Sequence, residues 1–196
     1  MAEENIKRKV IRISMLGDST VGKTSIINAF LNIEFSNTLL SNIGVEKTET
    51  KMIMKDGNEM KIIIWDTAGQ ERFHSIATGT IKNSQGIVVT FDLTNRKTFE
   101  NVIKWLEDIR DNNNKIPIIL FGNKCDLVEK REVEDEEAQE FAKNNNLEYF
   151  ETSAKENINV KEGFIKIAEE AYEKSGGAIG MDLKKNRKKN SKKCCK

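Results

Sequence analysis

Cysteine residues and long apolar runs are both scarce in this sequence. Only three cysteines occur among 196 residues, Cys125, Cys194 and Cys195, which is too few for a disulfide-bonded scaffold. No apolar stretch approaches the roughly 20 residues that a membrane-spanning helix requires, and the first segment, MAEENIKRKV, lacks the apolar region of a secretory signal. We therefore expect a cytosolic chain whose fold depends on neither disulfides nor a membrane span.

Positive charge is concentrated near the end of the sequence. The formal net charge is +1, yet residues 184–196 contain eight Lys or Arg residues and no acidic residue, so the other 183 residues sum to −7. A nucleic-acid-binding domain would carry its positive charge on a folded face, so we expect no nucleic acid among the partners. Residues 1–175 are expected to form one domain, followed by the glycine-containing, basic residues 176–196 as a flexible tail.

Short apolar runs alternate with helical patterns up to about residue 175. The expected strands are rich in Ile and Val, as in strands buried on both faces, and they are Val10–Leu16, Ile62–Trp65, Ile87–Asp92, Ile116–Gly122 and Glu148–Glu151. The expected helices are Thr24–Leu31, Thr98–Arg110, Glu136–Asn144 and Val160–Lys174. This alternation predicts an α/β fold with a parallel sheet covered on both sides and with ligands at the carboxyl ends of the strands.

The segment Glu46–Lys55 is more polar than the other runs and alternates in hydrophobicity. It is separated from Glu59–Trp65 by Asp56-Gly57-Asn58, a combination that is typical of tight turns. We therefore expect the two segments to form an antiparallel hairpin, with Glu46–Lys55 near an edge of the sheet.

The octapeptide GDSTVGKT, Gly17–Thr24, follows an expected strand, opens an expected helix and matches the phosphate-binding pattern G-x-x-x-x-G-K-[ST]. In this pattern, backbone N–H groups at a helix N-terminus surround phosphate oxygens. We expect Lys23 to contact the β- and γ-phosphates and to neutralise developing charge, and the Thr24 hydroxyl to bind Mg²⁺. A plain strand-to-helix turn is the alternative, which the context disfavours. The predicted nucleotide-binding residues are Gly17, Asp18, Ser19, Thr20, Val21, Gly22, Lys23, Thr24 and Ser25.

The pentapeptide DTAGQ, Asp66–Gln70, directly follows another expected strand. Asp66 can hold Mg²⁺ through a water molecule, and Gly69 can offer its N–H group to a γ-phosphate. Gln70 can orient an attacking water, as a glutamine does in GTP hydrolysis. Alone, the run could be an ordinary turn. In a chain with a phosphate-binding loop, we interpret it as the hydrolytic part of one site.

Two further short motifs follow strands, NKCD (Asn123–Asp126) and ETSAK (Glu151–Lys155). The Asp126 carboxylate can accept hydrogen bonds from both N1–H and N2–H₂ of guanine, a donor pair that adenine lacks. Asn123 and the stem of Lys124 would contact the base, and a backbone N–H near Ala154 would meet guanine O6. Each string is common in plain loops, but their order and positions predict selection of guanine. The nucleotide-binding residues predicted here are Asn123, Lys124, Asp126, Ser153, Ala154 and Lys155.

Together, GDSTVGKT, WDTAGQERF, GNKCD and ETSAK resemble the motifs of the Ras superfamily of small GTPases. Trp65 before DTAGQERF, the segment IGVE and the paired terminal cysteines resemble the Rab branch, whose members act in vesicle traffic. The resemblance covers the chain from Val10 to Lys196. It implies the α/β fold of P-loop small GTPases, with a six-stranded, mostly parallel sheet, one antiparallel edge strand and five helices. It also implies Mg²⁺ and GTP or GDP as ligands.

The resemblance further implies two nucleotide-dependent switch segments, around Phe35–Glu46 and around Asp66–Lys82. Phe35 matches the position whose ring packs beside the guanine. The implied partners of the monomer are an exchange factor, a GTPase-activating protein, effectors, a Rab escort protein and a GDP-dissociation inhibitor, at the cytoplasmic face of an intracellular membrane. Hydrolysis of GTP to GDP and phosphate is expected to be slow without a partner that supplies an arginine.

For the terminal KCCK, the resemblance implies a geranylgeranyl group on each of Cys194 and Cys195. KCCK does not fit the C-a-a-X pattern, so escort-dependent prenylation is implied. Two lipid chains with a polybasic segment hold a protein on a membrane, whereas one chain gives marginal binding. The alternatives are a disulfide, which between neighbours closes almost no loop, a zinc site, for which the tail lacks further ligands, and a merely solvated tail.

One position departs from the Rab pattern in the segment LLSNIGVEK. Rab proteins carry a threonine there whose hydroxyl completes the Mg²⁺ shell when GTP is bound, but this sequence has Asn42. We interpret Asn42 as a nucleotide-binding residue and a bulkier candidate metal ligand, with Ser41 as its substitute if the loop shifts by one residue. A first switch that closes more loosely over GTP is expected to slow hydrolysis. The alternative function is a GTP-binding adaptor that hydrolyses GTP very slowly or not at all.

The expected effector-binding surface departs from the Rab pattern as well. Rab proteins usually have three aromatic residues there, and the matching positions in this sequence are Lys47, Trp65 and Thr80. Because aromatic side chains dominate interface hot spots, we expect partners distinct from those of typical Rab proteins. The predicted surface comprises Ile43, Gly44, Lys47, Trp65, Phe73 and Thr80.

Overall fold

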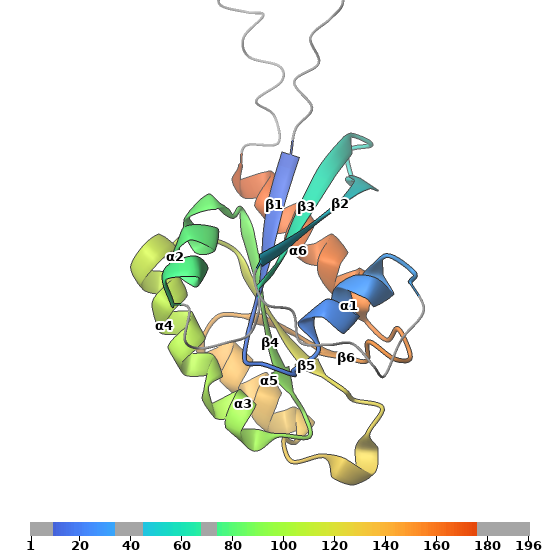
Figure 1. Cartoon of the computed structure of the whole chain (residues 1–196), viewed down its shortest axis with the longest axis vertical. Coiled ribbons are helices and arrows are strands. Elements are labelled where there is room, and N and C mark those ends of the chain that lie inside the picture. Colours follow the sequence, from blue (N-terminus) through green and yellow to red (C-terminus); the bar gives the residue numbers. More distant parts are fainter. Residues whose placement is uncertain (1–9, 34–44, 68–73, 176–196) are drawn as a thin grey trace, which may run out of the picture.

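The computed structural model describes residues 10–33, 45–67 and 74–175. Within these ranges the chain forms six strands (Figure 1). The strands are β1 (Val10–Leu16), β2 (Val45–Ile53), β3 (Glu59–Thr67), β4 (Gly86–Asp92), β5 (Ile118–Asn123) and β6 (Glu148–Thr152). The helices are α1 (Lys23–Phe30), α2 (His74–Asn83), α3 (Arg96–Glu100), α4 (Val102–Asn113), α5 (Asp135–Asn144) and α6 (Val160–Lys174), with the short 3₁₀ helix η2 (Val128–Lys130). In these described ranges, no helix has both the length and the apolar character to cross a bilayer.

The strands follow the order β2-β3-β1-β4-β5-β6 across the sheet. Neighbouring strands are parallel except for β2 and β3, in which Val45 lies opposite Thr67. The predicted six-stranded, mostly parallel sheet with one antiparallel edge strand is therefore confirmed. Only Asn101 separates α3 from α4. If these two are counted as one interrupted helix, the described part of the chain has the five α-helices that the resemblance implied.

Different helices cover the two faces of the sheet. In Figure 1, α1 and α6 lie on one face, and α2, α3, α4 and α5 lie on the other. On the α6 side, the ring of Phe121 on β5 packs edge-on against Phe164, with the ring centroids 6.1 Å apart. Gly163 allows this close packing, because a Cβ atom there would lie 2.3 Å from the Phe121 ring. The covered sheet brings the segments that follow β1, β3, β5 and β6 to one edge, where ligands bind in folds of this kind.

The β2–β3 hairpin turns at Asp56-Gly57-Asn58, as the sequence predicted. Gly57 has a φ of +80°, a left-handed conformation that glycine adopts at no steric cost. The end of α6 contacts this turn: the Tyr172 hydroxyl donates to Asp56 Oδ2 at 2.7 Å, and Asn58 Nδ2 donates to the Tyr172 hydroxyl at 3.1 Å. The turn and the last part of α6 are thus joined through Tyr172, and Lys55 in the turn also forms an ion pair with Glu169 on α6.

Some element boundaries differ from those that the sequence pattern indicates. α2 spans His74–Asn83, where the segment HSIATGTIKN has too few apolar residues to show a helical period. β5 begins at Ile118 rather than Ile116, because Pro117 has no N–H group to donate to a neighbouring strand. The helix expected at Thr98–Arg110 begins earlier and is interrupted at Asn101.

Candidate functional site

The loop Gly17–Thr24 connects β1 to α1 and encloses its own lysine. Lys23 Nζ donates hydrogen bonds to the carbonyl oxygens of Gly17 at 2.9 Å and of Asp18 at 2.7 Å. Lys23 is only 6% exposed. This burial lowers the pKa of Lys23 to about 8, although the nearby carboxylates of Asp66 and Asp18 act in the opposite direction. The ammonium group is therefore held inside the loop, where a phosphate could replace the carbonyl oxygens as its partner.

The pairing of β1 with β3 brings Thr24 and Asp66 together. Met15 on β1 and Asp66 on β3 occupy paired positions, and Thr24 Oγ1 donates a hydrogen bond to Asp66 Oδ2 at 2.5 Å. Asp66 is 4% exposed. A hydroxyl and a carboxylate are hard oxygen donors of the kind that Mg²⁺ prefers. The two residues thus fit a magnesium ion bound by the threonine directly and by the aspartate through a water molecule.

Backbone conformation restricts which residues the loop accepts. Gly17, Thr20 and Gly22 have φ values of 136°, 66° and 99°. A Cβ atom at Gly17 would lie 2.1 Å from the carbonyl oxygen of Thr90, and one at Gly22 would lie 2.3 Å from Asn123 Nδ2. Thr20 is β-branched and in the left-handed region, which costs on the order of 1–3 kcal/mol. Strain of this kind is concentrated in ligand-binding loops.

Asn123 connects three of the predicted motifs. It ends β5 and is 1% exposed. Its Nδ2 donates to the carbonyl oxygen of Val21 at 2.8 Å, and its Oδ1 accepts hydrogen bonds from the backbone N–H of Ala154 at 3.2 Å and from the Thr152 hydroxyl at 3.4 Å. One buried amide therefore positions NKCD against both the phosphate-binding loop and ETSAK. The contact of Asn123 with the purine stays a prediction.

The loops that follow β5 and β6 are also held against each other. The Ser153 hydroxyl donates to Asp126 Oδ1 at 2.6 Å, and the backbone N–H of Glu156 donates to the Ser153 hydroxyl at 3.0 Å. Lys124 has a φ of 70°, and its Nζ lies 2.5 Å from Asp92 Oδ2 at the end of β4. The Asp126 carboxylate thus lies where the two loops meet, as a guanine-binding role requires.

Several predicted residues fall outside the described ranges, and these are Phe35, Asn42, Ile43, Gly44, Gly69, Gln70, Phe73, Cys194 and Cys195. Of the other predicted effector-binding residues, Lys47 on β2 and Trp65 on β3 occupy paired positions, and Thr80 lies on α2. Lys47 is exposed and forms an ion pair with Glu49, while Trp65 and Thr80 are half-buried. The sheet register therefore places a lysine directly beside Trp65.

Asn101 and Trp105 contact the phosphate-binding loop, although sequence reasoning does not identify them as part of the site. Asn101 Nδ2 donates to Asp18 Oδ2 at 2.7 Å, and Trp105 Nε1 donates to Asp18 Oδ1 at 2.9 Å. The spacing of Trp105 relative to other apolar residues indicates a core residue. Nothing in the neighbouring sequence indicates that its indole N–H contacts a distant loop. These two residues fix the Asp18 carboxylate from the junction of α3 and α4.

We expect Trp105→Phe to destabilise the protein by about 2 kcal/mol, because the phenyl ring keeps most of the packing but cannot donate to the Asp18 carboxylate. Urea denaturation measures this difference. The matched control is Trp65→Phe, because the Trp65 indole N–H has no hydrogen-bond partner among the described residues, and its cost should stay within about 0.5 kcal/mol. Equal effects of the two substitutions would show that the Asp18 contact contributes nothing.

These features define the class of the protein: a P-loop protein of the GTPase fold, with the motifs predicted to bind Mg²⁺ and guanine at the carboxyl ends of β1, β3, β5 and β6. A profile of the Ras family matches residues 12–173. The chain is 39% identical to Ras-related protein Rab-13 of Canis lupus familiaris, over 94% of this chain and 95% of that one. It is 40% identical to Ras-related protein Rab-10 of Diplobatis ommata, over 85% and 83% of the two chains, and 42% identical to Ras-related protein Rab11A of Lotus japonicus, over 83% and 72%. The chain belongs to the Rab family of small GTPases.

Proposed function

We propose that this Rab-family chain is a nucleotide-dependent switch in vesicle transport. Bound GTP orders two surface segments so that effectors bind, and hydrolysis to GDP releases them. The observation that carries the proposal is the buried amide of Asn123, which is bonded to Val21 of the phosphate-binding loop and to Ala154 of ETSAK. One side chain thus holds together the loop for the phosphates and the loop for the base. The site therefore fits a whole nucleotide, whose phosphates and base bind at the same time.

The specificity for guanine is tested by calorimetry with GDP and ADP on the same preparation. We expect tight binding of GDP and no measurable binding of ADP. Asp126→Ala should weaken GDP binding by about 100-fold or more, since it removes an acceptor of two charge-assisted hydrogen bonds. Asp111→Ala, at an exposed position on α4, is the control and should leave GDP binding unchanged. Similar affinities of the unaltered chain for GDP and ADP would contradict the proposal.

For hydrolysis, we assign roles to residues on both sides of the phosphates. Thr24 and Asp66 would hold Mg²⁺, which neutralises phosphate charge when it is bound. Lys23 would contact the β- and γ-phosphates, and Gln70 would place the attacking water. We propose that this reaction is slow until a GTPase-activating protein supplies an arginine.

Asn42→Thr is expected to raise the rate of single-turnover GTP hydrolysis roughly tenfold, equivalent to about 1.4 kcal/mol. The physical reason is that a hydroxyl of threonine size would restore the Mg²⁺-dependent closure of the first switch, which the bulkier amide loosens. Hydrolysis is followed with Mg²⁺ present, and Ser41→Thr is the control for a loop that is shifted by one residue. An unchanged rate in Asn42→Thr would disprove the loosened switch. Undetectable hydrolysis by the unaltered chain, even with an activating partner, would favour the adaptor function.

We further propose that residues 1–175 form the nucleotide-binding domain and that residues 176–196 attach it to a membrane. Geranylgeranyl groups on Cys194 and Cys195, with the basic segment, would hold the protein at the cytoplasmic face of an intracellular membrane. An escort protein would present the chain for prenylation, an exchange factor would load GTP, and a GDP-dissociation inhibitor would return the GDP form to the cytosol.

A further inference from the structure

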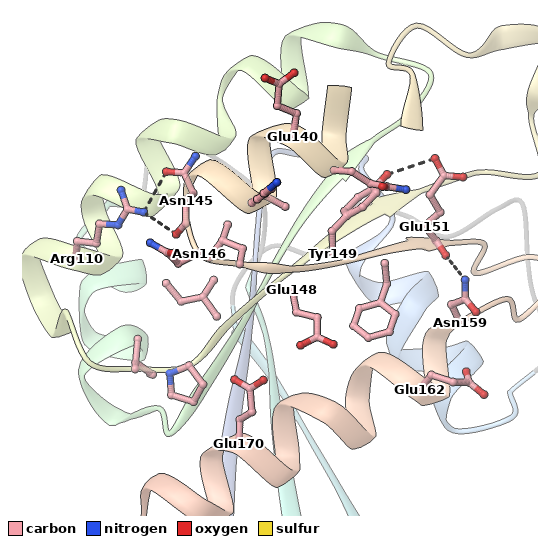
Figure 2. A pocket seen from close by; sticks show the side chains of 18 of the residues that line it. Arg110, Glu140, Asn145, Asn146, Glu148, Tyr149, Glu151, Asn159, Glu162 and Glu170 are labelled. Carbon is pink, nitrogen blue, oxygen red and sulfur yellow. Dashed lines mark hydrogen bonds between the residues drawn. The ribbon is translucent and has the colours of Figure 1, made fainter. Parts of the chain in front are cut away.

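The outer edge of β6 borders a groove rather than another strand. β6 is the last strand in the order of the sheet, and a groove of about 1670 Å³ follows its length between α5 and α6 (Figure 2). Among residues 10–33, 45–67 and 74–175, no strand pairs with this side of β6, and near the end of the strand Asn159 Nδ2 donates a hydrogen bond to the Glu151 carbonyl at 2.8 Å. An unpaired strand edge presents backbone donors and acceptors to any segment that docks against it.

The groove is strongly acidic. Seven Asp or Glu residues line it, against three Lys or Arg residues. Glu136 and Glu140 come from α5 and Glu162 from α6, and the described part of the chain provides no ion-pair partner for these three. Figure 2 shows Glu148 and Glu170 pointing toward the same space between β6 and α6, where Lys166 pairs with both. An extended cationic segment would therefore meet uncompensated carboxylates on both sides of the strand edge.

This chain contains such a segment close to the groove. Residues 184–196 carry eight Lys or Arg residues and no acidic residue. Lys174, the last residue of α6, itself lines the groove, so the chain that leads to the segment starts at one end of the groove. The nine residues 175–183 can span up to about 30 Å when extended. Since α6 is only about 22 Å long, the basic segment can reach every part of the groove.

We propose that residues 184–196 of this chain dock into the acidic groove between α5, β6 and α6, and that an anionic membrane surface competes with the groove for them. Tethering gives the segment a local concentration in the millimolar range, so that even weak ionic contacts fill the site. The same lysines that bind anionic lipid would then be retained on the folded domain when no membrane is present. The docking is independent of the proposed nucleotide switch, because the three carboxylates that carry it, those of Glu136, Glu140 and Glu162, lie outside the nucleotide-binding loops named above.

The experiment uses the full-length, non-prenylated chain with a nitroxide spin label on Cys195, in a background of Cys125→Ser and Cys194→Ser. Paramagnetic broadening of backbone amide signals then reports where the tail lies. We expect broadening of amides in β6, α5 and the facing turns of α6, and its loss at about 1 M NaCl, where the Debye length is roughly 3 Å. Vesicles containing phosphatidylserine should also abolish it, whereas vesicles of phosphatidylcholine alone should not.

Two charge variants determine whether the groove is the binding site. Glu136→Gln, Glu140→Gln and Glu162→Gln together should remove the broadening. The matched triple variant Glu100→Gln, Glu107→Gln and Glu129→Gln, at exposed positions away from the groove, should retain it. Broadening that is absent, that persists in the groove variant, or that spreads equally over other faces would overturn the proposal. Broadening that disappears on dilution would also overturn it, since the occupant would be the tail of a second copy. Calorimetry also measures the GDP affinity of each variant. A variant that binds GDP normally but shows no docking contradicts only the docking proposal, whereas loss of GDP binding in the unaltered chain contradicts the proposed function.

Discussion

Gly22→Ala is expected to weaken GDP binding by roughly 100-fold, equivalent to about 3 kcal/mol. Gly22 has a φ of 99°, and a Cβ atom there would lie 2.3 Å from Asn123 Nδ2. Left-handed backbone costs an alanine about 1–2 kcal/mol, and the displaced Asn123 amide would lose its hydrogen bond to Val21, which is worth about 1 kcal/mol. The same amide holds Ala154, so the damage should extend from the phosphate side to the base side of the site. Calorimetry with GDP measures the loss.

The matched control for this prediction is Gly57→Ala. Gly57 also has a positive φ of 80°, but no atom lies within 4 Å of a Cβ atom placed there. An alanine at this position therefore introduces the same kind of backbone strain at the distant β2–β3 turn, which lowers the stability by about 1 kcal/mol. GDP binding should not change in this variant. If Gly22→Ala bound GDP as tightly as Gly57→Ala, the connection through Asn123 would be irrelevant to nucleotide binding.

Lys23→Met is expected to have opposite effects on binding and on stability. Removing the ammonium group should weaken GDP binding by about 100-fold or more, since a buried charge that meets phosphate oxygens is lost. The nucleotide-free protein should nevertheless become more stable at pH 7. Burial lowers the pKa of Lys23 to about 8 from 10.5, so the charged form is disfavoured in the folded state by on the order of 3 kcal/mol.

The pH dependence of the free energy of unfolding tests whether the buried charge of Lys23 causes this difference in stability. Below pH 8 the lysine is charged in both states, and the folded protein carries the full penalty. Between about pH 8 and 10.5 the unfolded chain binds more protons than the folded one, so the free energy of unfolding of the unaltered protein rises with pH relative to that of Lys23→Met. Urea denaturation of nucleotide-free protein at pH 7 and pH 9.5 measures this convergence. The control Lys82→Met, at an exposed position on α2, should differ from the unaltered protein by the same free energy at both pH values. If the difference between Lys23→Met and the unaltered protein were also the same at both pH values, the penalty could not be assigned to Lys23.

The sequence predicted those parts of the molecule whose residues act locally. The buried run Val10–Leu16 and the amphipathic run Val160–Lys174 are observed as β1 and α6 with the predicted bounds. A strand buried on both faces is a nearly continuous apolar run, and a helix buried on one face shows a helical period. The antiparallel hairpin followed from the turn residues at Gly57 and its neighbours. The phosphate-binding loop followed from glycine and lysine spacing, which is fixed by the geometry of the loop itself.

The remaining features depend on contacts that no local pattern contains. The hydrogen bonds from Asn101 and Trp105 to Asp18 connect residues that are 83 and 87 positions apart. The residues next to Asn101 and Trp105 in the sequence therefore do not predict the contact with Asp18. Asn123 was predicted to contact the base, and its bonds to Val21 and Ala154 emerge only when three strand ends meet. α2 forms although its sequence lacks a clear helical period, and its residue Ile81 is fully buried in the core on that side of the sheet.

The hydrogen bonds of Tyr172 to the β2–β3 turn have a mechanical consequence. Tension on a protein tethered beyond α6 enters the fold at the last turns of that helix, and a free helix end under load would fray residue by residue. Here Tyr172 bonds the end of the helix to Asp56 and Asn58, and Glu169 forms an ion pair with Lys55 of the same hairpin. The load is therefore shared with the β2–β3 hairpin at the edge of the sheet, and these contacts oppose unwinding of the helix end.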